Sequence, residues 1–195
     1  MRVIRTACVL AAGLACTALS ASAQEHRQLG PHVHGHGHLN IAIEGKTVSM
    51  ELEVPGMDIV GFEHEPSTPD QKAALEKAKA KLADGLSIFT PAPSAGCALK
   101  SAKVATQAEH EDEHEHEHEH EADADEHEAG HHHSEFHVEY SLECSSPSRL
   151  TAMTFDYFKT FAGAQVLNIA VISPKGQSSF EVTRDKPSLD LAGIM

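Results

Sequence analysis

Long apolar runs are absent from most of this 195-residue sequence, and basic residues are scarce in it. It has 15 Lys and Arg residues against 29 Asp and Glu residues, with a formal net charge of −14. No basic cluster offers a surface for nucleic acid or anionic lipid, so neither is an expected partner. The one apolar run, residues 7–19, is too short to span a bilayer. We therefore expect no membrane insertion of the mature chain.

The N-terminus has the pattern of a secretory signal peptide. Arg2 and Arg5 precede the apolar run, and the small residues Ala21-Ser22-Ala23 follow it. This order of charge, apolar run and small residues predicts export, with cleavage of residues 1–23. A lipoprotein acylated at Cys16 is the alternative, although the residues before Cys16 make a poor acylation signal.

Cysteine is also scarce, because only Cys97 and Cys144 remain after the predicted cleavage. In an exported protein an isolated pair of this kind predicts a disulfide. The loop-closure model gives about 3–4 kcal/mol of stabilisation for such a ring. The pair brackets a His-rich stretch, so we expect the disulfide to hold both ends of that stretch to the folded body. The alternative, a thiolate metal site, needs reduced cysteines in an oxidising compartment.

The most unusual feature is the stretch 109–137, which has ten His, thirteen Asp or Glu and no Lys or Arg. It has too little apolar surface to offset the entropy of ordering, so it predicts a disordered loop. Imidazole nitrogen and carboxylate oxygen are ligand atoms of divalent metals, zinc above all. The alternative is a solvated acidic linker without a metal role.

Within this loop, His residues two or four positions apart can reach one metal ion from an extended or a helical chain. Many overlapping sets are possible, which predicts several weak, interchangeable sites. Segments such as 110–114 match the zinc-protease pattern HExxH, but they lack the apolar face of a packed helix. The loop ligands are His110, His114, His116, His118, His120, His127, His131, His132, His133 and His137.

A second set of candidate ligands lies beside a predicted β-hairpin, where a rigid element can preorganise them. The alternatives are a flexible tail for residues 32–38 and a partly buried, hydrogen-bonded role for His64. The set consists of His32, His34, His36, His38, Glu63 and His64.

Alternating apolar residues predict a hairpin of strands 39–43 and 48–54, with His38 and Asn40 on its polar face. Thr68, Pro69 and Gln71 form a helix start, which predicts an amphipathic helix that ends near Asp84. Further strands are expected at 86–89, 97–106, 136–142, 150–155, 166–172 and 178–183, and a short helix at 156–161. These elements predict an α+β fold with a largely antiparallel sheet and one long disordered His/Glu-rich loop between two strands. Residues 24–195 are expected to form a single α+β metal-binding domain.

The motifs HVHGHGHLNIAIEG, LEVPGMDIVGFEHEPSTPDQ and LTAMTFDYFKTFAGAQVLNIAVISPKGQ, together with the loop between two cysteines, resemble the ZrgA type of bacterial periplasmic zinc-binding protein. The resemblance covers essentially the whole mature chain. It implies a periplasmic role in zinc uptake or handling beside a zinc importer or its binding protein. It also implies that His32, His34 and His64 are the ordered ligands, whereas His36 and His38 depart from the family pattern.

The expected function is therefore capture or buffering of zinc (Zn²⁺) for uptake, without enzyme activity. One alternative is sequestration of copper or nickel (Cu²⁺ or Ni²⁺), because the same ligands bind copper more tightly. Another is a metalloenzyme with an open zinc position. A third is a transporter-associated adaptor without essential metal binding.

Overall fold

The computed structural model describes residues 33–109 and 133–195 of the chain. The predicted signal peptide lies outside these residues, and so does the part of the predicted loop from 110 to 132. The described elements form a sheet of six strands, a smaller sheet of three strands, and several short helices around one helix of 15 residues.

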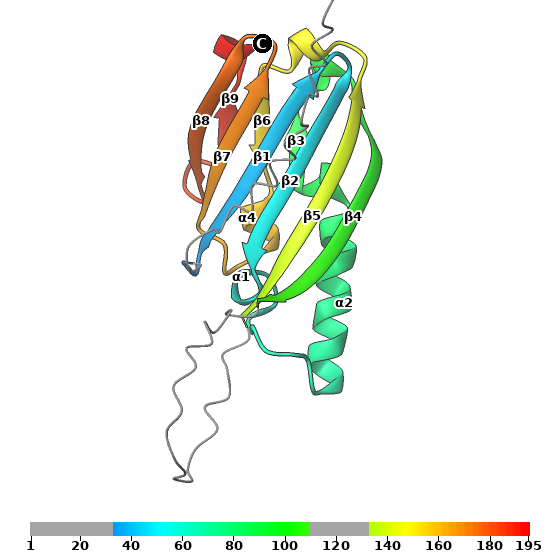
Figure 1. The fold of residues 1–195 in the computed structure, drawn as a ribbon, viewed down its shortest axis with the longest axis vertical. Coiled ribbons are helices and arrows are strands. Elements are labelled where there is room, and N and C mark those ends of the chain that lie inside the picture. Colours follow the sequence, from blue (N-terminus) through cyan, green and yellow to red (C-terminus); the bar gives the residue numbers. More distant parts are fainter. Residues whose placement is uncertain (1–32, 110–132) are drawn as a thin grey trace, which may run out of the picture. The chain divides into compact units, whose positions relative to one another are not determined.

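The larger sheet has the strand order β4-β5-β2-β1-β7-β8 (Figure 1). Neighbouring strands are antiparallel, except that β1 and β7 are parallel. This arrangement confirms the predicted α+β fold with a largely antiparallel sheet. The strands are β1 (His36–Glu44), β2 (Thr47–Pro55), β4 (Cys97–Glu109), β5 (His133–Cys144), β7 (Val166–Ser173) and β8 (Gly176–Thr183).

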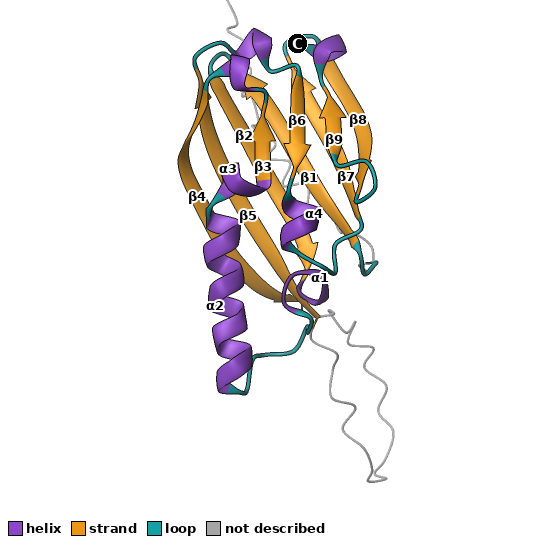
Figure 2. Cartoon of the chain, turned by 180° about the vertical axis from the view of Figure 1, so that it is seen from behind, coloured by secondary structure: helices purple, strands orange, loops and turns teal. Residues whose placement is uncertain are grey.

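The remaining elements cover one face of the larger sheet (Figure 2). In the described ranges, no helix is long and apolar enough to cross a membrane. The covering elements are α1 (Gly56–Val60), α2 (Pro69–Ala83), α3 (Gly85–Ile88), β3 (Phe89–Pro91), β6 (Ala152–Phe155), α4 (Tyr157–Thr160), β9 (Ser188–Asp190) and three 3₁₀ turns at Pro93–Ala95, Pro147–Arg149 and Ala192–Ile194.

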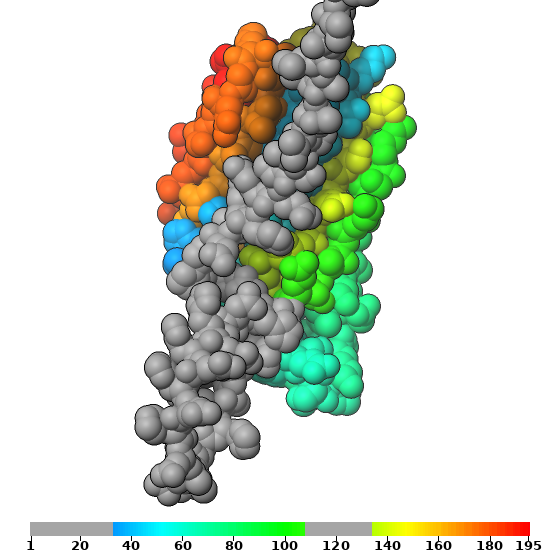
Figure 3. Space-filling model, in the orientation of Figure 1, coloured from blue at the N-terminus to red at the C-terminus, as the bar shows by residue number. Residues whose placement is uncertain are grey.

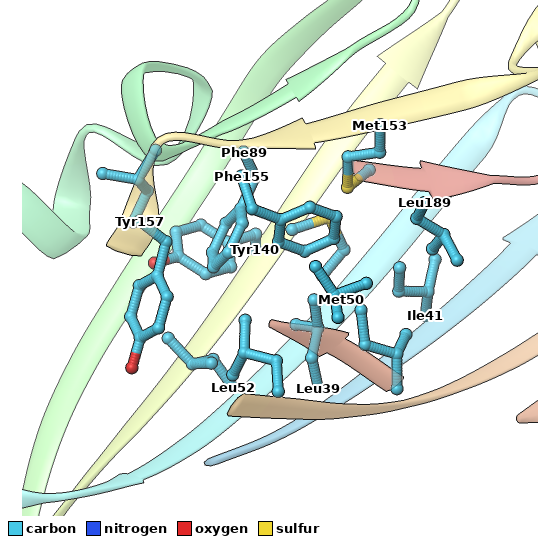
Figure 4. Packing of buried hydrophobic residues seen from close by; sticks show 14 of the residues in the cluster. Leu39, Ile41, Met50, Leu52, Phe89, Tyr140, Met153, Phe155, Tyr157 and Leu189 are labelled. Atoms are coloured by element: carbon cyan, nitrogen blue, oxygen red, sulfur yellow. The ribbon is translucent and has the colours of Figure 1, made fainter. Parts of the chain in front are cut away.

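The core lies between the larger sheet and this covering layer (Figure 4). Alternate residues of β1 and β2, such as Leu39 and Leu52, are fully buried there. Phe89 of β3 lies at the centre of an aromatic group, with its ring centroid 5.6 Å from that of Phe155 and 5.8 Å from that of Tyr140. Burial of these large apolar side chains is the main favourable term holding the two layers together.

The opposite, outward face of the larger sheet carries mainly polar side chains, together with Ile172 of β7, which is 55% exposed. It carries the alternate residues of each strand, which include His38 and Asn40 of β1 as predicted. Figure 3 views this side, with β7 and β8 along one margin and β4 along the other. Apart from a register shift in β4 between Leu99 and Ser101, the two-residue period therefore separates an apolar core face from a face with ionisable side chains.

Helix α2 confirms the predicted start and end. Thr68 is its N-cap, and the Gln71 side chain completes a capping box. Ala78 and Leu82 face the core, and the Leu82 carbonyl accepts a hydrogen bond of 2.8 Å from the Tyr140 hydroxyl.

Three local predictions differ from the structure. The segment 86–89, expected to be a strand, is mostly the one-turn helix α3, because Gly85 allows the chain to turn tightly against the Tyr140 ring. The segment after Pro55, for which the sequence predicted no helix, contains α1. The predicted loop 109–137 is too long at its C-terminal end, since residues 133–137 pair with β4 and Phe136 is 1% exposed.

The predicted disulfide between Cys97 and Cys144 is present. However, these residues pair at the end of the β4–β5 ribbon opposite to the Glu109–His133 pair. The disulfide therefore does not hold the base of the His-rich segment, as the sequence had suggested. The ladder of strand pairs between β4 and β5 fixes that base instead.

We predict that replacing both Cys97 and Cys144 with Ala lowers the free energy of unfolding by about 2–4 kcal/mol, because the unfolded chain gains loop entropy. Urea denaturation of the variant and of the wild-type protein measures this difference. Wild-type protein unfolded under reducing conditions is the control and should lose a similar amount. A loss below about 0.5 kcal/mol would contradict a stabilising role.

Candidate metal-binding site

Three segments with predicted ligands meet at one end of the larger sheet (Figure 1). Because β1 and β2 are antiparallel, the start of β1 lies beside the end of β2, with His38 opposite Glu53. The end of β2 lies in turn beside the start of β5. At the same end, Glu109 of β4 pairs with His133 of β5. The topology, together with the contact between His34 and Glu63, thus gathers the N-terminal His segment, the connection between α1 and α2, and both anchor points of the His-rich segment.

His34 lies in the turn before β1, and its Nε2 is 2.9 Å from Oε1 of Glu63. The His34 side chain is 55% exposed, whereas that of Glu63 is 10% exposed. The structure therefore brings together two of the predicted ligands, an accessible imidazole and a nearly buried carboxylate. Both are ligand types that zinc accepts.

Gly35 determines where His34 lies. Its N–H donates to both carboxylate oxygens of Asp58, at 2.7 and 2.9 Å. Its carbonyl accepts hydrogen bonds from the N–H groups of Gln165 and Val166, at 2.9 and 2.8 Å. The φ angle of Gly35 is +85°, which favours glycine. Both backbone groups of the turn are thus tied to other parts of the chain, which limits the positions open to the His34 ring.

Asp58 of α1, whose carboxylate accepts these bonds from Gly35, is buried, with 4% exposure. Gly163 packs against it so closely that a Cβ there would lie 2.5 Å from the Asp58 Cα. Burial raises the pKa of Asp58, although the hydrogen bond from Gly35 and the nearby His34 ring oppose this rise. Asp58 was not among the predicted site residues. In the sequence, Asp58 differs from its neighbours only in that it is an acidic residue inside the mainly apolar segment 57–60.

His64 lies in the connection between α1 and α2 and takes part in other contacts. Its ring stacks on Phe62, with centroids 5.2 Å apart. Its Nδ1 is 2.9 Å from the carbonyl oxygen of Glu65, and its Nε2 is 3.3 Å from the amide nitrogen of the Gln71 side chain. Each ring nitrogen of His64 thus has a contact within the chain. To bind a metal ion, the nitrogen that binds it would have to lose its contact.

A second group of imidazole and carboxylate side chains lies on the outward face, near the start of β5. His137 Nε2 is 2.8 Å from Glu135 Oε2, and His137 Nδ1 is 3.9 Å from Glu53 Oε1. Glu135 is buried, with 7% side-chain exposure. The sequence analysis placed His137 both at the end of the predicted loop and in the predicted strand 136–142, and it did not select Glu53 or Glu135. The alternation of residues 134–144 could have shown that Glu135 and His137 share one strand face.

The predicted ordered set is only partly assembled. The structure pairs His34 with Glu63, and it places His36 and His38 on the exposed face of β1. Within the described residues, no three His, Cys, Asp or Glu side chains form a ready metal-binding group. The ordered site of the predicted composition therefore stays a prediction. His32, His110, His114, His116, His118, His120, His127, His131 and His132 lie outside the described residues.

Imidazole and carboxylate pairs at one end of an antiparallel sheet have the ligand chemistry of a divalent-metal-binding protein. The comparison with protein families is more specific. The chain belongs to the ZrgA family of zinc uptake proteins, which matches residues 31–191. This match confirms the resemblance seen in the sequence and supports a role connected with zinc uptake. A search of curated proteins found no match.

We predict that the change Asp58→Asn alters the pH dependence of folding stability in the metal-free protein. Because the folded-state pKa of Asp58 is raised, its contribution to stability is fully present below the unfolded-state value of 3.8 and falls as pH rises through the folded-state pKa. The variant lacks this titration, so its stability relative to wild type should improve from pH 3.5 to 5.5. Urea denaturation across this range measures the difference. A constant difference would contradict the raised pKa.

Proposed function

We propose that this protein captures zinc in the periplasm and passes it on or buffers it, without catalysing a reaction. Membership of a zinc uptake family supports the metal. The observation that carries the proposal is the convergence, at one sheet end, of the His34–Glu63 pair and the two anchor points of the His-rich segment. The export signal in residues 1–23 supports the compartment.

The two parts of this arrangement suit different tasks. A stretch with many interchangeable ligands can collect cations, and its negative charge raises their local concentration. Ligands held by a rigid sheet end can bind with defined geometry, which raises affinity and selectivity. The turn that contains His34 suits binding with defined geometry, because Asp58, Gln165 and Val166 restrain Gly35 beside it.

Zinc titration against a chromophoric chelator tests the proposal on two variants. One lacks residues 110–132 and keeps β4 and β5 whole, because a longer deletion to residue 137 would remove the buried Phe136. The other carries His32→Ala, His34→Ala and His64→Ala. We expect the deletion to remove the weaker sites and to keep the tightest one. We expect the triple change to weaken the tightest site at least tenfold.

The matched control replaces His114, His116 and His118 with Ala, which removes the same number of imidazoles from the His-rich segment. It should leave the tightest site unchanged. If the triple change at residues 32, 34 and 64 has no larger effect than this control, the ordered site is not primary. If the wild-type protein binds no zinc at micromolar concentration, the proposed function is wrong. Competition with Cu²⁺ measures selectivity in the same assay.

We also predict that zinc binding weakens as pH falls, because the metal needs neutral imidazole. The loss should occur around pH 6.5, the ordinary pKa of a histidine side chain. Isothermal titration calorimetry at pH 7.5, 6.5 and 5.5 measures the affinity and the stoichiometry. Unchanged values across this range would exclude histidine as the main ligand.

A further inference from the structure

Arg184, the residue after β8, holds the segment 158–165, which runs from α4 to the start of β7. Its Nε donates a hydrogen bond of 3.2 Å to the Gln165 side chain, and its backbone N–H donates one of 2.9 Å to the Gln165 carbonyl. Its guanidinium also donates to four backbone carbonyls of this segment, those of Phe158 (2.6 Å), Phe161 (2.9 Å), Ala162 (2.9 Å) and Ala164. One side chain therefore fixes the path of the backbone between α4 and β7.

A guanidinium suits this task, because it is planar, always charged and carries five N–H donors in a fixed arrangement. Carbonyls in the last turn of a helix have no partner within the helix, and Arg184 supplies one for Phe158 of α4. Arg184 is half-buried, where hydrogen bonds are stronger than in bulk water. A lysine at this position would keep the charge but would reach fewer of these carbonyls at once.

Gln165 joins the segment held by Arg184 to the turn before β1. Its N–H donates to the Gly35 carbonyl at 2.9 Å, and the next N–H, that of Val166, donates to the same carbonyl at 2.8 Å. The start of β7 lies beside the start of β1, because these two strands pair in parallel. The position of Gln165 therefore sets the position of Gly35 and of the neighbouring residue His34.

Gly163 provides a second contact between the segment 158–165 and this turn. A Cβ at residue 163 would lie 2.5 Å from the Asp58 Cα, so the backbones of the two residues pack closely. The Asp58 carboxylate in turn accepts both hydrogen bonds from the Gly35 N–H. A shift of the segment 158–165 would thus disturb the partners of both backbone groups of Gly35.

We propose that Arg184 is a positioning residue for zinc binding at His34. It acts through the segment 158–165 and through Gly35, which keep the His34 ring beside Glu63. Arg184 is not a ligand itself, because a guanidinium is always protonated and has no acceptor atom. This inference rests on the proposed function in one respect, that His34 binds zinc. Loss of the guanidinium weakens binding although every ligand stays in place.

The test titrates zinc into the full mature chain with Arg184→Met, in the presence of a competing chelator that suppresses weak binding. Methionine keeps an unbranched apolar stem and removes all five side-chain donors. We expect the tightest site to weaken about tenfold, the lower end of the range for residues that act through a ligand. The change Arg184→Lys should restore part of this affinity.

A double-mutant cycle separates positioning of His34 from a general loss of stability. In a protein that already carries His34→Ala, the change Arg184→Met should have no further effect on zinc affinity. The matched control, Ser173→Ala, removes the hydrogen bond of 2.6 Å from the Ser173 hydroxyl to the Ile194 carbonyl at the other end of β7. It should lower the free energy of unfolding and leave the zinc affinity unchanged.

Amide hydrogen exchange in the metal-free protein measures the same effect without zinc. The Gly35 amide should exchange about tenfold faster in Arg184→Met, relative to the amides that pair β1 with β2, because the turn opens locally. The Ser173→Ala control should leave this ratio unchanged. An unchanged ratio in Arg184→Met would overturn the inference, whatever the zinc affinity.

The outcomes for this inference and for the proposed function are distinguishable. If His34→Ala weakens zinc binding but Arg184→Met changes neither the affinity nor the exchange at Gly35, only the inference is wrong. If the wild-type protein binds no zinc, the proposed function is wrong and Arg184 has no role in zinc binding.

Discussion

Pairing of β2 with a neighbour on each side is the constraint on which the rest of this structure depends. Its register with β1 and with β5 sets which residues stand opposite one another along the whole sheet. A shift of one residue in either pairing would move the apolar residues of that strand out of the core. Because burial of Leu39, Leu52 and Val138 holds the register, the same apolar contacts hold Glu53 between His38 and His137.

The turn before β1 shows how a candidate ligand is positioned at the cost of some stability. A buried carboxylate is unfavourable unless hydrogen bonds satisfy it. Asp58 receives such a bond from Gly35, and the close packing of Gly163 leaves no space for a larger residue there. The hydrogen bonds between Gly35 and Asp58 fix the residue next to His34. Glu63 contacts the His34 ring. Without Asp58, this turn would lose one of the two sets of hydrogen bonds that restrain Gly35.

The disulfide and the His-rich segment illustrate the limit of reasoning from sequence order. Two cysteines that bracket a stretch in sequence need not lie at its base in space. The intervening strands β4 and β5 are long, so the disulfide closes the far end of the ribbon. Helix α2 was predictable because its capping box and its apolar positions are local. The helix turn α3 was not, because it depends on close contact between Gly85 and Tyr140, which are distant in sequence.

The sequence by itself determined the chemistry of this protein: the excess of acid, the density of histidine, the disulfide partners and the alternation that builds the sheet. These are properties of composition or of neighbouring residues, and they need no knowledge of the fold. Only the tertiary structure decided which carboxylate meets which imidazole. Glu63 meets His34 through the turn after α1, and Glu53 approaches His137 through strand register. The physical reason is that non-local backbone pairing, driven by burial of the opposite face, sets the neighbours of every exposed side chain.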